Sequence, residues 1–125
     1  MKGENNANPL TDIRERTFTF ALRVIKLCQT LDTASGVQRT LSKQLLRSGT
    51  SIGANVEEAH GSQSKADFTA KLSIACKEAR ETHYWLRLLA ASELVPEKRI
   101  HDLTDESNQL IAILTTIVKK CRSTA

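Results

Sequence analysis

Hydrophobic residues recur at helical spacing in four separate segments of the chain. Steps of three and four residues keep such side chains on one face of a helix, so the pattern predicts four amphipathic α-helices. We expect these helices over residues 11–32, 37–60, 64–92 and 96–121. The side chains expected to face the core are Ile13, Thr17, Phe20, Val24, Leu27, Leu31, Leu41, Leu45, Ser48, Ile52, Val56, Ala59, Phe68, Leu72, Ala75, Ala79, Thr82, Leu86, Leu89, Ile100, Leu103, Ser107, Leu110, Leu114, Ile117 and Cys121. The apolar stripe of the first helix is expected to be widened by Phe18, Ala21, Ile25 and Cys28.

Residues at the ends of these segments are typical helix boundaries. Thr11 is suited to cap the first helix. Ser64, with Asp67 three residues later, has the spacing of a capping box. Gly61 is suited to end the second helix in a left-handed conformation, and Pro96 suits the first position of the fourth helix.

Four helices with short connections predict an all-α protein, an antiparallel up-down-up-down four-helix bundle over residues 11–122. The chain of 125 residues has the length of one domain. Residues 1–10 are expected to form a flexible N-terminal arm. A helix-turn-helix, with Gly49 at its turn, is the competing interpretation of the stretch TLSKQLLRSGTSIGANV, although the apolar pattern continues through the glycines without restarting.

Two glycines interrupt the second helix four residues apart. Gly49 and Gly53 each cost about 1 kcal/mol relative to alanine in a helix interior. Small neighbours, Ser48, Ser51 and Ala54, complete a strip that lets another helix approach closely. We therefore expect close helix packing at Gly49 and Gly53; the alternative is a kink with no partner.

Composition restricts the class of protein more than it identifies a reaction. The formal net charge of +4 is mildly basic. No apolar run reaches 18 residues and the N-terminus lacks an apolar signal core, so we expect a cytoplasmic protein without a membrane-spanning helix. Three widely separated cysteines fit reduced thiols, because their spacing forms no metal or disulfide motif. They are Cys28, Cys76 and Cys121.

The stretch QLLRSGTSIGANVEEAHGSQSKADF, followed by KLSIACKEARETHYWLRLL, resembles the bacterial four-helix-bundle family of the 23S rRNA intervening-sequence proteins. The combination of RSGTSIGAN with SKADF and KEARET carries the likeness, which is strongest from residue 44 to 89. Some relatives are encoded within inserts in 23S rRNA genes, and a more distant relative works with a reverse transcriptase and nucleic acid. The resemblance implies a homopentameric ring.

A polar stripe runs along the second helix beside the apolar one. If the second and third helices turn around residues 61 to 64, Arg47 falls near Glu78, and Asn55 falls near Thr69 or Lys71. Such a seam would fix the register of the two helices or bind a ligand. The alternative is a solvated face whose ion pairs contribute about 0–1 kcal/mol each. The proposed seam residues are Arg47, Asn55, Glu58 and Glu78.

Basic residues suggest where nucleic acid would bind. One stripe follows the second helix, at Arg39, Lys43 and Arg47, and the first helix adds Arg23 and Lys26. A further group of cations at one end of the bundle is diluted by acidic neighbours. The single Tyr84–Trp85 pair is expected to flank the core or to reach a neighbouring chain, and it is too small to serve alone as a stacking platform.

No pattern in the chain predicts catalysis, a metal or a cofactor. A di-iron bundle needs two Glu-x-x-His pairs, and the chain has one, Glu57 with His60. No nucleophile elbow, phosphate-binding loop or dinucleotide fingerprint occurs. We therefore expect a non-enzymatic, homo-oligomeric bundle that binds RNA or DNA through basic patches. A protein adaptor that binds no nucleic acid is the alternative, and a membrane partner is not expected.

Overall fold

The computed structural model describes residues 9–32 and 36–123, with side chains from residue 12. Four helices account for nearly all of them: α1 (Pro9–Leu31), α2 (Val37–His60), α3 (Lys65–Ala91) and α4 (Glu97–Ser123). The described residues include no strand. Most of the expected N-terminal arm, residues 1–8, lies outside the described residues.

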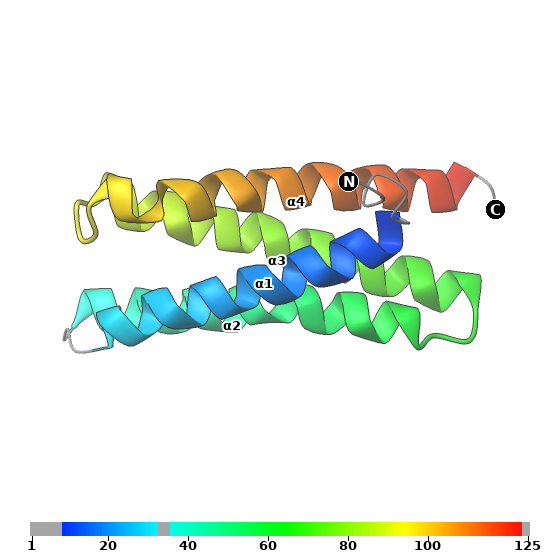
Figure 1. Ribbon diagram of the computed structural model, residues 1–125, viewed down its shortest axis with the longest axis horizontal. Helices are drawn as coiled ribbons and strands as arrows, with labels where there is room; N and C mark the ends of the chain where they lie inside the picture. Colours follow the sequence, from blue (N-terminus) through cyan, green and yellow to red (C-terminus); the bar gives the residue numbers. More distant parts are fainter. Residues whose placement is uncertain (1–8, 33–35, 124–125) are drawn as a thin grey trace, which may run out of the picture.

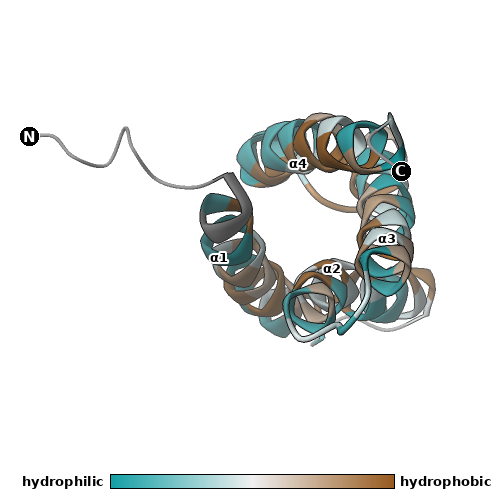
Figure 2. Cartoon of the chain, turned by 90° about the vertical axis from the view of Figure 1, so that its right-hand side faces the viewer, coloured by the Kyte–Doolittle hydropathy of each residue, from teal (hydrophilic) through white to brown (hydrophobic). Residues whose placement is uncertain are grey.

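Consecutive helices run antiparallel, so the predicted up-down-up-down bundle is confirmed (Figure 1). Viewed end-on, the helices follow one another around a common axis in the order α1, α2, α3, α4 (Figure 2). Each helix turns its apolar stripe toward that axis. No helix in the described part of the chain combines the length and apolar character that crossing a membrane requires.

The core consists mainly of aliphatic side chains at the predicted three- and four-residue spacing. Ile13, Phe20, Leu72, Leu86 and Leu114 are completely buried. Five polar residues lie among the apolar ones, and four of their hydroxyls lie within hydrogen-bond distance of helix carbonyl oxygens. These residues are Thr17, Ser42, Ser48, Thr82 and Ser107.

The helix boundaries agree with the predictions to within two residues. α1 begins at Pro9, which suits a first helical turn, so Thr11 lies inside the helix. Ser64 caps α3 by accepting a hydrogen bond from the Asp67 amide at 3.0 Å. The left-handed conformation expected at Gly61 is wrong, because its φ is −91°. Gly36, immediately before α2, adopts a positive φ of 68°.

Helix α2 is continuous through both glycines, which excludes the helix-turn-helix interpretation. A Cβ atom on Gly53 would lie 3.3 Å from the backbone oxygen of Thr17, and one on Gly49 would lie 2.9 Å from Cγ1 of Val24. The absent side chains therefore let α1 lie directly against α2. The closely packed neighbour of these glycines is in the same chain.

One expectation for α1 is wrong. Phe18 and Ile25 were expected to widen the buried stripe, but they are 63% and 38% exposed. Cys28 is buried as expected. Because α1 packs so closely on α2, residues at the edge of its apolar stripe remain outside the core.

Gly49→Ala should destabilise the bundle by about 1–3 kcal/mol, because the added methyl group overlaps the Val24 side chain. Urea denaturation measures this cost. In a Val24→Ala background the same substitution should instead stabilise by about 1 kcal/mol, the difference in helix propensity.

Gly61→Ala is the matched control, since its Cβ would meet only the Glu58 carbonyl oxygen at 3.7 Å. An equal loss of stability at Gly61 and Gly49, or a Gly49 penalty that persists without the Val24 side chain, would contradict the close-packing explanation.

Candidate nucleic-acid interface

The basic stripe predicted on α2 is only partly free to meet an anion. Arg47 is bound by two carboxylates of α3. Arg39 lies 3.7 Å from Asp32, with both side chains mostly exposed. Lys43 forms no ion pair with a described carboxylate and lines a hollow between α1 and α2 together with Ile25 and Leu46. Of the stripe, Lys43 is therefore available to bind an anion. Arg39 is available once its exposed ion pair with Asp32 breaks, which costs little free energy.

Of the two cations predicted on α1, Arg23 does not join this stripe. Arg23 lies on the α4 side of α1, where it lines a hollow with Asp12, Glu15 and Glu106. Lys26 is exposed. The five cations predicted for nucleic-acid binding are therefore spread over different sides of the bundle.

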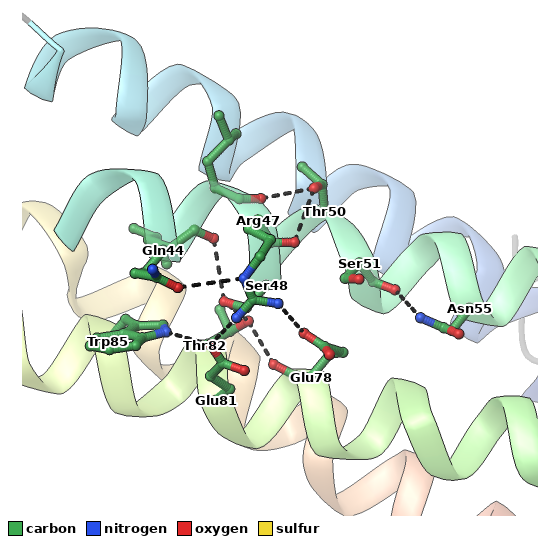
Figure 3. Close-up of polar contacts among 12 residues, drawn as sticks. Gln44, Arg47, Ser48, Thr50, Ser51, Asn55, Glu78, Glu81, Thr82 and Trp85 are labelled. Atoms are coloured by element: carbon green, nitrogen blue, oxygen red, sulfur yellow. Dashed lines mark hydrogen bonds and ion pairs between the residues drawn. The ribbon is translucent and has the colours of Figure 1, made fainter. Parts of the chain in front are cut away.

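Arg47 is the centre of a polar seam between α2 and α3 (Figure 3). Its guanidinium contacts Glu78 at 3.3 Å and also pairs with Glu81. Glu81 in turn accepts a hydrogen bond of 2.9 Å from the indole of Trp85. Helical spacing predicted the contact of Arg47 with Glu78 but not the roles of Glu81 and Trp85, although these two lie one turn apart on α3 and could have been found in the same way.

The remaining seam residues contribute separately. Glu58 pairs with Lys71 of α3 at 2.9 Å. Asn55 donates to the carbonyl oxygen of Ser51 in its own helix, at 2.9 Å. Within the part of the chain that the structure describes, its side chain forms no hydrogen bond to Thr69 or Lys71. Two ion-pair groups, rather than one continuous network, therefore connect α2 and α3 at the surface.

A buried hydrogen bond lies beneath the Arg47 group. The Thr82 hydroxyl donates to Ser48 Oγ across the helix interface at 2.9 Å, and both side chains are fully buried. Thr82 Oγ1 also lies 2.7 Å from the carbonyl oxygen of Glu78. This pair satisfies two polar groups in the core and defines the register of α2 against α3. The seam is explained by helix pairing without any ligand.

The seam changes the titration of Glu81. The hydrogen bond from Trp85 lowers the pKa of Glu81, and the Arg47 guanidinium lowers it further, although partial burial opposes both effects. Glu81 therefore stays ionised well into the acidic range. Its carboxylate already forms an ion pair with Arg47 and accepts a hydrogen bond from Trp85.

Side chains that could have formed a metal or catalytic site have other roles. Glu57 is bound by Arg14 at 2.8 Å. His60 places Nδ1 3.1 Å from the Val56 carbonyl oxygen and packs edge-on against Phe68. Burial raises the pKa of the Cys28 thiol, which is the opposite of what a nucleophile needs. Within residues 9–32 and 36–123, no group of three metal-ligating side chains gathers.

An exposed apolar face lies along the outer side of α1 and α2. We call the side chains Phe18, Leu22, Ile25 and Leu46 the apolar face. All four are more than one third exposed, and Leu22 reaches 48%. Beside them is a hollow of about 320 Å³, lined also by Ala21, Gly53 and Ala54. Spacing alone could have found Leu22, because it lies one turn after Phe18.

Comparison with known proteins identifies close relatives. The family described as 23S rRNA-intervening sequence protein matches residues 11–116. A crystal structure of a protein of unknown function, from the S23 ribosomal protein family of Bacteroides thetaiotaomicron VPI-5482, is 39% identical. Its likeness covers 90% of this chain and 99% of that one, with a TM-score of 0.82. No curated protein matches the chain.

Protonation of Glu81 should weaken the α2–α3 seam at acidic pH. Because the pKa of Glu81 is lowered on folding, its contribution is complete above its ordinary value of about 4.5 and is lost as the pH falls through the lowered pKa. The loss should be at most about 1 kcal/mol, since Arg47 is half exposed. Trp85 is the only tryptophan, so its fluorescence should report a transition with a midpoint below 4.5 while the helices persist.

Glu81→Gln should abolish that fluorescence transition. The same titration curve in this variant would assign the effect to another group and contradict the seam described above.

Proposed function

The chain belongs to the 23S rRNA-intervening sequence protein family, and from this premise we propose that it is a non-enzymatic, homo-oligomeric bundle of the cytoplasm that associates with nucleic acid. The observation that carries the proposal is the number of surface cations left without a carboxylate partner. Carboxylates bind Arg14 and Arg16 at 2.8 Å and Lys71 at 2.9 Å. Arg47 is bound by two carboxylates. The cations that form no ion pair with a described carboxylate include Arg23, Lys26, Lys43, Lys77, Arg80, Arg87, Lys98 and Lys119.

Unpaired cations on a rigid helical surface suit the phosphate backbone. Binding to phosphates releases condensed counterions, so such a surface gains affinity without reading a base sequence. One chain has a net charge of +4, which is a weak attractor. Several copies in one assembly multiply that charge and repeat each patch. We therefore propose weak sequence selectivity and strong dependence on salt.

Self-assembly is proposed to bury the apolar face. Three large apolar side chains at spacings of four and three residues on α1, joined by Leu46 of α2, form an unusually continuous patch for an exposed helix surface. A second copy of the chain is the proposed occupant. The resemblance to the family implies five copies, and a contact between two different faces of each copy closes such a ring by rotation.

A protein adaptor is the second candidate function. The hollow beside Phe18 and Leu22 is lined mainly by apolar and small side chains, and grooves that accept an amphipathic helix are hydrophobic as well. If a different protein occupied this hollow, the apolar face would serve that partner instead of a second copy. The two candidates differ in the oligomeric state of the isolated chain and in its affinity for nucleic acid.

Replacing Phe18 and Leu22 with serine should dissociate the assembly without unfolding the bundle. Both side chains are about half exposed or more, so the single chain loses little by their removal. Sedimentation at micromolar concentration should show an oligomer for the natural chain and a 13.9 kDa monomer for the variant.

Val37→Ser is the matched control, because Val37 is 66% exposed but lies outside the apolar face. It should sediment like the natural chain. A natural chain that is monomeric at this concentration would overturn the proposed self-assembly.

The assembled protein should bind mixed single-stranded RNA and DNA at low salt. With several phosphate contacts, its affinity should fall roughly tenfold or more when salt rises from about 50 mM to about 200 mM. Electrophoretic mobility shift at the two salt concentrations measures this fall. If neither nucleic acid is bound at low salt, the nucleic-acid proposal fails and the adaptor function takes its place.

A further inference from the structure

One side of α3 carries cations and an aromatic ring in a regular row. Lys77, Arg80, Tyr84 and Arg87 follow one another at steps of three, four and three residues, and all four are exposed. This spacing places them on one helix face over about 15 Å. We call these four residues the α3 row. The buried positions of α3 occupy the opposite face.

Helix α3 separates its charges by side. Its carboxylates Glu78 and Glu81 face α2, where both contact Arg47. The three cations of the α3 row form no ion pair with a described carboxylate. Burial lowers the pKa of the adjacent His83, and the positive charge of Arg87 lowers it further, so this ring adds no charge at neutral pH. The row therefore presents three positive charges that no neighbouring carboxylate neutralises.

The C-terminal part of α4 extends this positive surface. Arg122 donates to Ser73 Oγ at 3.1 Å, and Cys76 Sγ lies 3.3 Å from Thr115 Oγ1. These contacts place the end of α4 beside the start of the α3 row. Lys119 is exposed one turn before Arg122 and forms no ion pair with a described carboxylate. The acidic Glu106 of α4 is bound by Arg16 of α1, on another side of the bundle.

The α3 row and the apolar face lie on different sides of the bundle. In the end-on view, α1 and α2 occupy the left and bottom, and α3 and α4 occupy the right and top (Figure 2). A second copy seated on the apolar face would cover the side of α2 that carries Leu46 and its neighbour Lys43. The α3 row remains accessible in that arrangement.

Tyr84 indicates which polyanion suits this surface. Its ring is 52% exposed and lies between Arg80 and Arg87 in the row. The Trp85 ring contacts it edge-on at a centroid distance of 5.1 Å and is itself anchored by Glu81. A supported, exposed ring between cations can stack an unpaired base while the cations contact phosphates.

A membrane surface would require a different composition. Helices that bind anionic lipid insert large apolar side chains beside their cations. The α4 side chains next to the row are polar, as Thr115 and Arg122 illustrate. Ile74, three residues before Lys77, is 39% exposed, but the larger apolar face lies on α1 and α2.

We propose that the α3 row, extended by Lys119 and Arg122, is the surface that binds single-stranded nucleic acid, with its cations on successive phosphates and Tyr84 stacked on a base. This inference rests on the proposed nucleic-acid association and assigns it to a face that the α2 stripe does not include.

The test compares two triple variants of the full chain with the same net charge. Lys77→Gln/Arg80→Gln/Arg87→Gln removes the cations of the row, and Lys26→Gln/Arg39→Gln/Lys43→Gln removes three predicted cations elsewhere. Fluorescence anisotropy with a labelled 20-nucleotide oligo(U) measures affinity at several salt concentrations. Circular dichroism and sedimentation verify that each variant folds and assembles like the natural chain.

The row variant should lose at least tenfold in affinity, and the slope of log K against log salt should fall by about 2, because each phosphate contact on a single strand contributes about 0.7. The control removes cations of the competing surface on α1 and α2, so it should lose clearly less affinity than the row variant and keep more of the salt slope. Tyr84→Leu should weaken binding by about tenfold while leaving the salt slope unchanged, since stacking releases no counterions.

Other outcomes separate the two proposals. If the natural chain binds no oligo(U) at low salt, the nucleic-acid association itself fails. If it binds and the row variant binds equally well, or if only the control loses affinity, that association stands and the assignment to the α3 row is overturned. Equal losses in both variants would indicate diffuse electrostatic attraction and would also overturn the assignment. The assignment would also be overturned if the row variant lost binding to phosphatidylserine vesicles but kept its binding to oligo(U).

Discussion

The close approach of α1 to α2 determines how the rest of the bundle is arranged. At Gly53 the α2 helix lies against the Thr17 backbone, and at Gly49 the Val24 side chain fills the space where a Cβ would be. Neither glycine has a side chain that could hold the two helices apart at these positions. On its other side α2 meets α3 through Ser48 and Thr82, whose short side chains form a hydrogen bond in the core. Small residues on two sides of α2 therefore hold three helices together.

This close packing also determines what remains on the surface. α1 has a broader apolar stripe than the core can accept, so Phe18, Leu22 and Ile25 stay exposed along its contact with α2. The carboxylates of α3 turn toward Arg47, and the cations of α3 remain on its outer side. One side of the bundle is thus suited to apolar association and another to an anionic ligand. Both surfaces follow from how the helices pair.

Much of the fold could be predicted from the sequence because a core-facing stripe repeats every three or four residues. Leu72, Leu86 and Leu114 are buried where that spacing places them. The Ser64 cap depends only on its neighbours and was also predictable. The exposure of Phe18 could not be predicted from the sequence, because it depends on how closely α1 approaches another helix. Gly61 shows a similar limit, since a glycine permits a left-handed conformation without requiring one.

The candidate site was less predictable than the fold. Sequence spacing suggested that Arg47 meets Glu78, but whether Arg47 is free for phosphate depends on the second carboxylate, Glu81. The α2 stripe is continuous in sequence, but in the folded chain Arg47 forms ion pairs with α3 and Arg39 lies 3.7 Å from Asp32. Conversely, the α3 cations are interspersed with acidic residues in sequence, and only the helix geometry separates Lys77 from Glu78. A count of charges along the chain cannot distinguish these cases.

Lysine footprinting tests the central claim most directly. The natural protein would be acetylated briefly with and without a single-stranded oligonucleotide, and modification at each lysine would be read by mass spectrometry. Binding along α3 and α4 predicts protection of Lys77 and Lys119, with Lys26 and Lys43 modified equally in both samples. Protection of Lys43 with no change at Lys77 and Lys119 would contradict the account.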